Sequence, residues 1–348
     1  MHSTTAVVIL NWNGRDFLEK FLPTLLQNTA DASIVVVDNC STDDSVDFLQ
    51  NYPSIEVIEN ASNGGFAKGY NDGLKQLKGR FDYYVLLNSD VEVSPNWLTP
   101  LVTKMDQNST IAGAQPKILS YHKKTHFEHA GACGGFMDKN HFPFCRGRIF
   151  DEVEEDNGQY DTEKEVFWST GACMIVRASV YHELGGLDED FFAHMEEIDF
   201  CWRAKKQGYS FYVLPQSKVY HVGGGTLNYE SPRKTYLNFR NSLLAIYKNY
   251  DGWRTGKLTY RFFLDGVATL KMLASFQFRH AGAVLKAHLS YYRSLPKLRK
   301  KRKIIRKQST GFNTIGLYNA SIVWAHFFKG VKTFSGLNKR FFKRSNNE

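Results

Sequence analysis

Apolar stretches alternate with helical patterns through residues 1–90, and this alternation limits the possible folds more than any other feature of the chain. The apolar stretches cover residues 6–11, 33–37, 55–58 and 83–88. Between them, residues 15–27 and 67–77 carry apolar side chains at helical spacing. Strands that alternate with helices predict a parallel sheet with right-handed crossovers. We therefore expect an α/β fold whose mostly parallel central sheet is flanked by helices.

The fourth apolar stretch ends in three polar residues, Asn88, Ser89 and Asp90. Ligands of open α/β sheets bind beyond the carboxyl ends of the strands, where a carboxylate can hold a hard divalent cation and its phosphates. Asn11 and Asp38 end two earlier stretches in the same way. A single aspartate at a strand end is often only a turn or capping residue. Three polar strand ends together predict a nucleotide-sized site at one edge of the sheet.

Two common nucleotide-binding patterns are absent from the chain. The first apolar stretch runs into Asn11-Trp12-Asn13-Gly14, whereas dehydrogenases carry a glycine fingerprint there that brings a pyrophosphate to a helix N-terminus. The P-loop pattern is also missing. The same segment lacks the basic, glycine-rich loop that nucleotidyltransferases usually carry, which makes that class a weaker alternative.

A second acidic cluster, with the sequence Glu-Glu-Ile-Asp, occupies residues 196–199. On a helix, Glu196, Asp199 and Arg203 share one face, and Glu197 lies about a quarter turn away. The cluster is either an exposed acidic face with an Asp199–Arg203 ion pair, or a general base with neighbours that position it. The spacing alone leaves both interpretations open.

His221 ends another short apolar strand and precedes a run of glycines. A lone histidine is usually a surface or core residue. Beside a diphosphate, however, an imidazole can complete a metal shell or donate a hydrogen bond to phosphate. His221 is therefore a candidate for the same site as the polar strand ends.

The distribution of charge divides the chain near residue 230. Residues 1–230 hold 19 Lys and Arg against 32 Asp and Glu, whereas residues 231–348 hold 25 against 3. We predict a catalytic domain over 1–230, with an excursion of loops and hairpins at about 120–165 on the acceptor side. A basic, amphipathic helical region is predicted over 231–348.

The basic region combines apolar-periodic, aromatic helices with a dense run of Lys and Arg at 293–307. This pattern favours an anionic membrane surface over nucleic acid, and a solvated helical face is the alternative. The chain has no run of about 18 apolar residues and no basic-then-apolar leader. Its five cysteines are widely spaced and form no CxxC pair. We therefore expect a cytoplasmic protein, peripheral at the inner face of the cell membrane.

Several short blocks follow one another in a specific order. They are residues 7–13, 37–43, 63–67, 88–90, 186–189 running on to 196–199, and 220–221. Together they resemble the family-2 glycosyltransferases, particularly bacterial rhamnosyltransferase-like members. Each block is short, but their common order and spacing make the combination specific. The resemblance ends near residue 230.

The resemblance implies a GT-A fold, which is Rossmann-like, and inverting transfer of a sugar from a nucleoside diphosphate sugar. It matches Asp38 to an acid that binds the base or ribose, and residues 63–71 to a loop that closes over the nucleotide. The donor-binding residues that it implies are Asn11, Asp38, Asn39, Asn63, Lys68, Asn71, Asn88 and Ser89.

The resemblance also implies a divalent metal, Mg²⁺ or Mn²⁺, held by Asp90 and His221. Many members carry an aspartate where this chain has Asn88, so the protein's hold on the metal rests mainly on Asp90. The catalytic base falls at Glu197, with Glu196 as its alternative, and Asp199 falls at a supporting acid.

We therefore predict a metal-dependent glycosyltransferase that moves a hexosyl or rhamnosyl group onto a glycan or lipid-linked acceptor. The expected setting is surface glycan or cell-envelope polysaccharide assembly, at an anionic membrane surface and without nucleic acid. Two alternatives stay open. One is a catalytically inactive membrane scaffold with the same fold, and the other is a nucleotidyltransferase.

Overall fold

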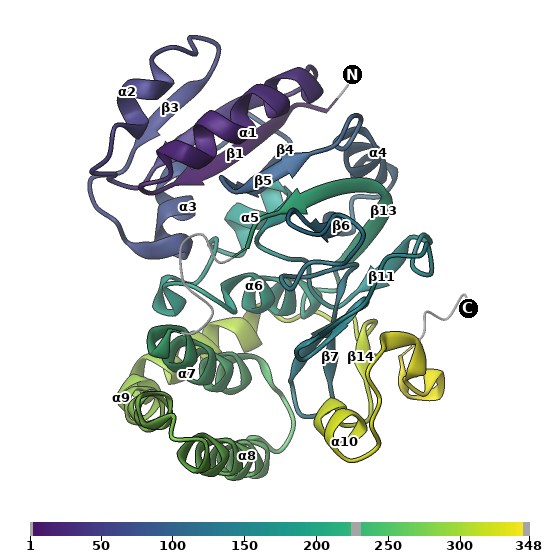
Figure 1. The fold of residues 1–348 in the computed structure, drawn as a ribbon. Helices are drawn as coiled ribbons and strands as arrows, with labels where there is room; N and C mark the ends of the chain where they lie inside the picture. The colour runs from purple at the N-terminus through teal and green to yellow at the C-terminus, as the bar shows by residue number, and fades with distance from the viewer. Residues whose placement is uncertain (1–2, 224–230, 344–348) are drawn as a thin grey trace.

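Four parallel strands from the first part of the chain form one half of a large sheet (Figure 1). The structure, a computed structural model, describes residues 3–223 and 231–343. The strands lie in the order β3–β2–β1–β4. Asn11 pairs with Asp38, and Leu10 pairs with Asn88. The polar ends of three strands therefore meet at one edge of the sheet. The strands are β1 (Thr5–Asn11), β2 (Ser33–Asp38), β3 (Glu56–Glu59) and β4 (Tyr83–Asn88).

Three helices follow these strands in turn: α1 (Arg15–Asn28), α2 (Ser45–Leu49) and α3 (Gly65–Gln76). Two glycines let α3 approach the sheet closely. A Cβ on Gly69 would meet Leu10 at 2.8 Å, and one on Gly73 would meet Val37 at 2.4 Å. The close approach holds the loop before α3 next to the polar strand ends.

The other half of the large sheet runs in both directions. Strand β12 (Cys173–Arg177) is antiparallel to β4 and to β6 (Ile111–Ser120), and β13 (Ser210–His221) is parallel to β6. The edge strands β5 (Val91–Val93) and β11 (Lys164–Val166) are antiparallel to β13. The prediction of an α/β fold with a mostly parallel sheet is confirmed: β3, β2, β1, β4, β6 and β13 run in one direction, and β12 runs against its neighbours β4 and β6. Strand β12 is reversed because the chain enters it from the polar edge of the sheet.

The predicted excursion at 120–165 forms most of a second sheet, with strand order β10–β9–β8–β7–β14. Its last strand comes from the C-terminal region and runs parallel to β7, as Figure 1 shows. The chain after residue 231 therefore returns to the body of the molecule. The strands are β7 (Gly135–Asp138), β8 (Pro143–Cys145), β9 (Arg148–Ile149), β10 (Glu152–Val153) and β14 (Leu317–Tyr318).

The helical region predicted after residue 230 is present and packs on the rest of the chain. Its helices are α7 (Pro232–Asn249), α8 (Arg254–Ala274), α9 (Phe278–Gln308) and α10 (Ile322–Phe327), and the earlier ones are α4 (Thr99–Gln107), α5 (Ala178–Glu183) and α6 (Glu196–Lys205). Leu243 and Ile246 of α7 belong to the same apolar cluster as Val8 of β1. The predicted boundary, residue 230, lies outside the described residues. The charge changes near it, but the hydrophobic core does not divide there.

Candidate active site

The carboxylate of Asp38 is held in place at the end of β2. Asn11 Nδ2 donates to it at 3.0 Å, and Ser41 donates through its hydroxyl at 2.6 Å and its backbone N–H at 2.8 Å. Asn11 Oδ1 is buried and finds no donor within the described part of the chain. It faces Gly14: a Cβ atom added at this glycine would lie 2.4 Å from Asn11 Oδ1 and 3.4 Å from Ser89 Oγ. An unmet buried acceptor is costly, so this edge suits a ligand that supplies an N–H or O–H group.

A chain of asparagine amides joins the end of β2 to the start of α3. Asn60 Nδ2 donates to Asn39 Oδ1 at 3.1 Å, and Asn39 Nδ2 donates to Asn63 Oδ1 at 2.9 Å. Asn63 Oδ1 also accepts the backbone N–H of Gly65 at 2.9 Å. The loop that was predicted to close over a nucleotide is therefore anchored beside Asp38.

Lys68 and Asn71, both predicted to bind the donor, have partners within the protein. Lys68 Nζ forms an ion pair with Asp72 at 2.7 Å. The Asn71 amide donates to the Leu187 carbonyl at 2.8 Å, and its oxygen accepts the Leu187 N–H at 2.9 Å and the Tyr181 hydroxyl at 2.8 Å. Asn71 thus ties α3 to the chain before α6. Contact of Asn71 with a donor requires this link to open.

His221 joins Asp90 to Glu128. Its Nε2 lies 3.2 Å from Asp90 Oδ1, and its Nδ1 lies 3.1 Å from Glu128 Oε2. Asn88 Nδ2 is 3.5 Å from the same Nε2. Strand β5 explains the meeting, because Val91 pairs with His221 at the end of β13. Asp90, Glu128 and His221 are all buried, so a distant part of the sequence completes the end of β4.

The two carboxylates control the charge of the imidazole. Burial alone lowers the pKa of His221, but the Asp90 and Glu128 carboxylates outweigh it and raise the pKa to about 10. Burial also raises the pKa of Glu128, and the bond and charge of His221 outweigh that effect and lower it to about 2. At neutral pH a cationic imidazole lies between two carboxylates.

Asp90 and His221 fit a divalent cation that takes most of its ligands from elsewhere. Mg²⁺ is usually bound by one or two carboxylates together with substrate phosphates. Asp90 Oδ1 and His221 Nε2 lie 3.2 Å apart, so one ion can bind both once it displaces the imidazole proton. Within residues 3–223 and 231–343, no three His, Cys, Asp or Glu side chains are arranged to hold a metal. An ion held by Asp90 and His221 would take its other ligands from substrate phosphates and water.

The helix that carries the second acidic cluster begins in a strained turn. Before α6, the backbone φ angles of Phe192, His194 and Met195 are 64°, 68° and 74°. Each left-handed non-glycine residue costs roughly 1–3 kcal/mol and persists only where its surroundings hold it. The turn directs the first residues of α6, Glu196 and Glu197.

Glu197 lies at the same end of the sheet as Asp90. A Cβ on Gly171 would stand 3.8 Å from Glu197 Cβ. The next residue, Ala172, accepts a backbone hydrogen bond from Asn88 at 3.0 Å. The chain that passes beside Glu197 is thus bonded directly to the end of β4, two residues before Asp90.

The pKa of the buried Cys145 thiol is affected by both Glu128 and Glu197. Burial is the main cause that raises the pKa of Cys145 to about 12, and the charges of Glu128 and Glu197 contribute to the increase. Both carboxylates therefore lie within electrostatic reach of one sulfur atom.

The two neighbouring glutamates, Glu196 and Glu197, have different pKa values because their surroundings differ. Glu196 is buried, and burial followed by the charge of Glu197 raises its pKa well above the usual value. Glu197 is partly exposed, and burial of its carboxyl raises the pKa to about 7. The surroundings of Glu196 thus favour its protonated form, whereas Glu197 titrates near neutral pH, as an efficient general base does.

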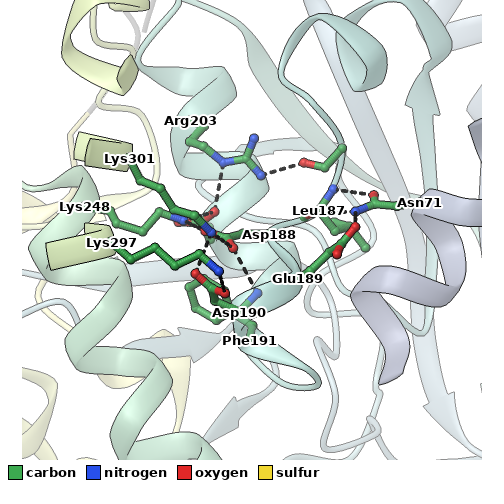
Figure 2. A network of polar contacts seen from close by, with 12 residues as sticks. Asn71, Leu187, Asp188, Glu189, Asp190, Phe191, Arg203, Lys248, Lys297 and Lys301 are labelled. Carbon is green, nitrogen blue, oxygen red and sulfur yellow. Dashed lines mark hydrogen bonds and ion pairs between the residues drawn. The ribbon is translucent and has the colours of Figure 1, made fainter. Parts of the chain in front are cut away.

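Asp199, the third acid of the cluster, is bound on all sides. Its carboxylate accepts from Arg203 at 2.8 Å, from Asn249 at 2.7 Å and from Lys248, which lies 2.9 Å away. Lys248 also pairs with Asp188, and Figure 2 shows Arg203 and Lys248 reaching this network from α6 and α7. Asp199 therefore anchors α6 to α7, and the supporting role implied for it stays a prediction.

The structure adds functional candidates that the sequence did not single out. Glu128 lies in the second-sheet region, where no spacing pointed to it, and only the fold brings it to His221. Ser41 follows Asp38 closely enough in sequence for its contact with that carboxylate to be foreseen. Lys248 and Asn249 belong to the region predicted for membrane contact, yet they hold Asp199.

The family model for glycosyl transferase family 2 matches residues 6–185, a stretch that includes Asn11, Asp38 and Asp90. The chain belongs to this family. Its fold is GT-A, and its large sheet, its polar strand ends and its C-terminal helices form the frame for the site described above.

Curated proteins similar to this chain are named as hexosyl- or rhamnosyltransferases. A low-salt glycan biosynthesis hexosyltransferase, Agl10 of Haloferax volcanii, is 24% identical over 69% of this chain and 74% of its own. An N-acetylglucosaminyl-diphospho-decaprenol L-rhamnosyltransferase of Mycobacterium tuberculosis is 22% identical over 73% and 87%. The dTDP-rhamnosyl transferase RfbF of Shigella flexneri is 24% identical over 62% and 71%.

Solved structures share the fold. A mannosyltransferase of Pyrobaculum calidifontis, in complex with GDP-Man and Mn²⁺, aligns with a TM-score of 0.52 at 12% identity over 88% of this chain and 86% of its own. GalNAc-T7 with UDP, GalNAc and Mn²⁺ aligns with a TM-score of 0.57 at 19% identity over 72% of this chain. The chain spans about half (49%) of that structure.

Proposed function

We propose that this protein is an inverting glycosyltransferase that moves a sugar from a nucleoside diphosphate sugar to an acceptor hydroxyl. The observation that carries the proposal is the position and the raised pKa of Glu197. Its carboxyl is buried, which raises its pKa to about 7, and it lies at the same end of the sheet as Asp90. A base and a phosphate-binding acid at one sheet edge are the two groups that this reaction needs.

The nucleoside of the donor fits beside Asp38. The unmet Asn11 Oδ1 supplies an acceptor there, and Asn39 and Asn63 hold the adjoining loop. The diphosphate fits beyond β4, where Asp90 and His221 would hold Mg²⁺ or Mn²⁺. Such an ion neutralises the charge that develops on the leaving diphosphate. The Mn²⁺ in two GT-A structures supports this choice of ion.

Glu197 acts on the acceptor. Its ionised carboxylate takes the proton from the attacking hydroxyl as that oxygen approaches the anomeric carbon opposite the diphosphate, which inverts the configuration. The raised pKa of Glu196 disfavours a second negative charge beside it. Asp199 takes no part in the proton transfer because Arg203, Lys248 and Asn249 already engage its oxygens.

The relatives support a rhamnosyl or hexosyl donor and a lipid-linked acceptor. We therefore expect the purified protein with Mn²⁺ to be stabilised by one member of a panel of nucleotide sugars, and to transfer or hydrolyse that donor. Thermal shift identifies the donor, and chromatography of the product measures turnover. A protein that binds a nucleotide sugar but never releases its diphosphate would instead be a scaffold. A protein that forms a nucleotide sugar from a sugar phosphate would be a nucleotidyltransferase.

We also infer that the protein attaches to an anionic membrane through a face of α8 and α9, here called the α8–α9 face. On each helix three side chains at positions i, i+4 and i+7 form one row, and all six are at least 50% exposed. No helix in the described part of the chain is long and apolar enough to cross a bilayer. The six residues are Phe263, Val267, Leu270, Leu285, Leu289 and Tyr292.

The charges beside the α8–α9 face suit anionic lipid. Exposed cations accompany the apolar rows at Lys271, Arg279, Lys286 and Arg293. Within these two helices, all of which the structure describes, the only carboxylate is Asp265, which is buried against Arg261. Amphipathic helices with this division of charge lie in the membrane interface, where they would bring the site to a lipid-linked acceptor.

Charge removal tests the membrane surface. With Arg279, Lys286 and Arg293 changed to Gln, we expect binding to phosphatidylglycerol-containing vesicles to weaken by about 100-fold, because each cation contributes roughly 1 kcal/mol. Co-sedimentation measures the binding. Equal charge removal at the exposed Lys20, Lys75 and Lys78 is the control and should leave binding nearly unchanged. Equal losses in both variants, or equal binding to neutral phosphatidylcholine vesicles, would contradict this surface.

A further inference from the structure

Groups outside the turn before α6 hold its backbone carbonyls. Phe191, Ala193 and His194 each present a carbonyl oxygen to the Asn241 amide, at 3.0, 2.9 and 2.7 Å. The carbonyl between the first two, that of Phe192, accepts the backbone N–H of Phe66 at 2.8 Å. Left-handed residues of this kind persist only where the surroundings hold them, and here one asparagine supplies most of the hold.

The Asn241 side chain makes all of its hydrogen bonds within this part of the protein. It lies on α7 and is completely buried. Its Oδ1 accepts from Arg240 Nε at 2.9 Å, so both ends of the carboxamide are engaged. Arg240 also donates to the carbonyls of Asp190 and Phe191, just before the left-handed residues. Arg240 and Asn241 of α7 thus hold the turn in place through hydrogen bonds to its backbone carbonyls.

We propose that Asn241 is a positioning residue for glycosyl transfer, which from α7 holds the turn that aims Glu197 at the reacting centre. The inference rests on the proposed function, because it takes Glu197 as the base. Asn241 touches neither donor nor acceptor in this scheme. It acts through the backbone of the turn and so determines where the Glu197 carboxylate stands relative to Asp90.

Other contacts hold the two sides of the turn and leave its centre to Asn241. Before it, Lys297 and Lys301 of α9 pair with Asp188 and Asp190, as Figure 2 shows. After it, the contacts of Asp199 with α7 anchor α6. These ion pairs secure the ends of the segment, so loss of the Asn241 amide is expected to disturb the left-handed centre rather than to unfold α6.

The test compares two asparagines that both donate to backbone carbonyls, the buried Asn241 and the partly exposed Asn313. In Asn241→Ser we expect kcat to fall by about 100-fold, the cost of misplacing a catalytic group by about 1 Å, while the KM for the donor changes little. The control is Asn313→Ser, which removes amide bonds to Tyr209 and Glu165 at the far edge of the sheet. It should lower the melting temperature without lowering kcat.

A second readout separates positioning from general loosening. A displaced turn admits water to Glu197 and weakens the burial that raises its pKa, so the acid limb of the kcat profile should move to lower pH. Should Asn241→Ser not fold, Arg240→Gln replaces it, with an expected kcat loss of about tenfold and the same shift of the limb.

Three outcomes would overturn the positioning role. They are an unchanged kcat in the folded variant, an equal kcat loss in Asn313→Ser, and a kcat loss with an unmoved acid limb. Full activity of Glu197→Gln would instead overturn the proposed base, so the two failures are distinguishable.

Discussion

Glu197→Gln is expected to abolish sugar transfer and to leave donor binding intact. The substitution keeps the shape of the side chain and removes its ability to accept a proton, and a general base typically contributes about 10²–10⁴ in rate. Turnover is measured with the donor identified by thermal shift, and donor affinity is measured by calorimetry. Glu183→Gln, an exposed acid of α5 outside the site, is the matched control and should keep full activity.

The pH profile gives an independent check of the same residue. Glu197 must be ionised to act, and its pKa is raised by burial to about 7. Activity should therefore be complete above that pH and fall as the pH drops through it. Glu196→Gln replaces a carboxyl whose raised pKa favours the protonated form, so it should be far milder than Glu197→Gln. A dead Glu196 variant beside an active Glu197 variant would transfer the base to Glu196.

Asp90→Ala is expected to remove metal-dependent donor affinity. Even residues that only support metal ligands change affinity or activity by about 10–100-fold when altered, so loss of a carboxylate ligand should cost at least about 100-fold. Calorimetry with Mn²⁺ and with EDTA measures donor binding in both proteins. EDTA should weaken the wild type and leave Asp90→Ala nearly unaffected.

The control for this variant is Asp47→Ala, which removes an exposed carboxylate from α2. It should bind the donor like the wild type. Unchanged Mn²⁺-dependent binding in Asp90→Ala would show that the cation, if used, is held without this residue.

The N-terminal half of the sheet and its polar edge were predictable from the sequence. Each of β1, β2 and β4 is a short apolar run that ends in a polar residue, and parallel strands with helical crossovers bring such ends to one edge. The contact of Asn11 with Asp38 follows from this pattern. The donor-binding roles of Lys68, Asn71 and the other matched residues rest on the family resemblance and stay predictions.

Contacts between remote segments were not predictable. Glu128 gave no signal, because its role depends on β5 and β13 bringing His221 to the end of β4. The charge change near residue 230 suggested a catalytic domain followed by a basic region that faces a membrane. In the structure, however, lysines of the basic region pair with Asp188, Asp190 and Asp199. A lysine that pairs with an aspartate and one that faces lipid look the same in a sequence.

The sequence by itself determined the strands, the helices and which acids end a strand or begin a helix, because period and local chemistry decide these. Only the tertiary structure decided the environments of Glu196 and Glu197. Neighbouring and identical in type, both have a buried carboxyl oxygen, and the charges of Glu197 and Asp199 further raise the pKa of Glu196. The fold decides how deeply a carboxyl is buried and which charges lie near it, and these determine its pKa. For this reason the assignment of the base depends on the turn that Asn241 holds.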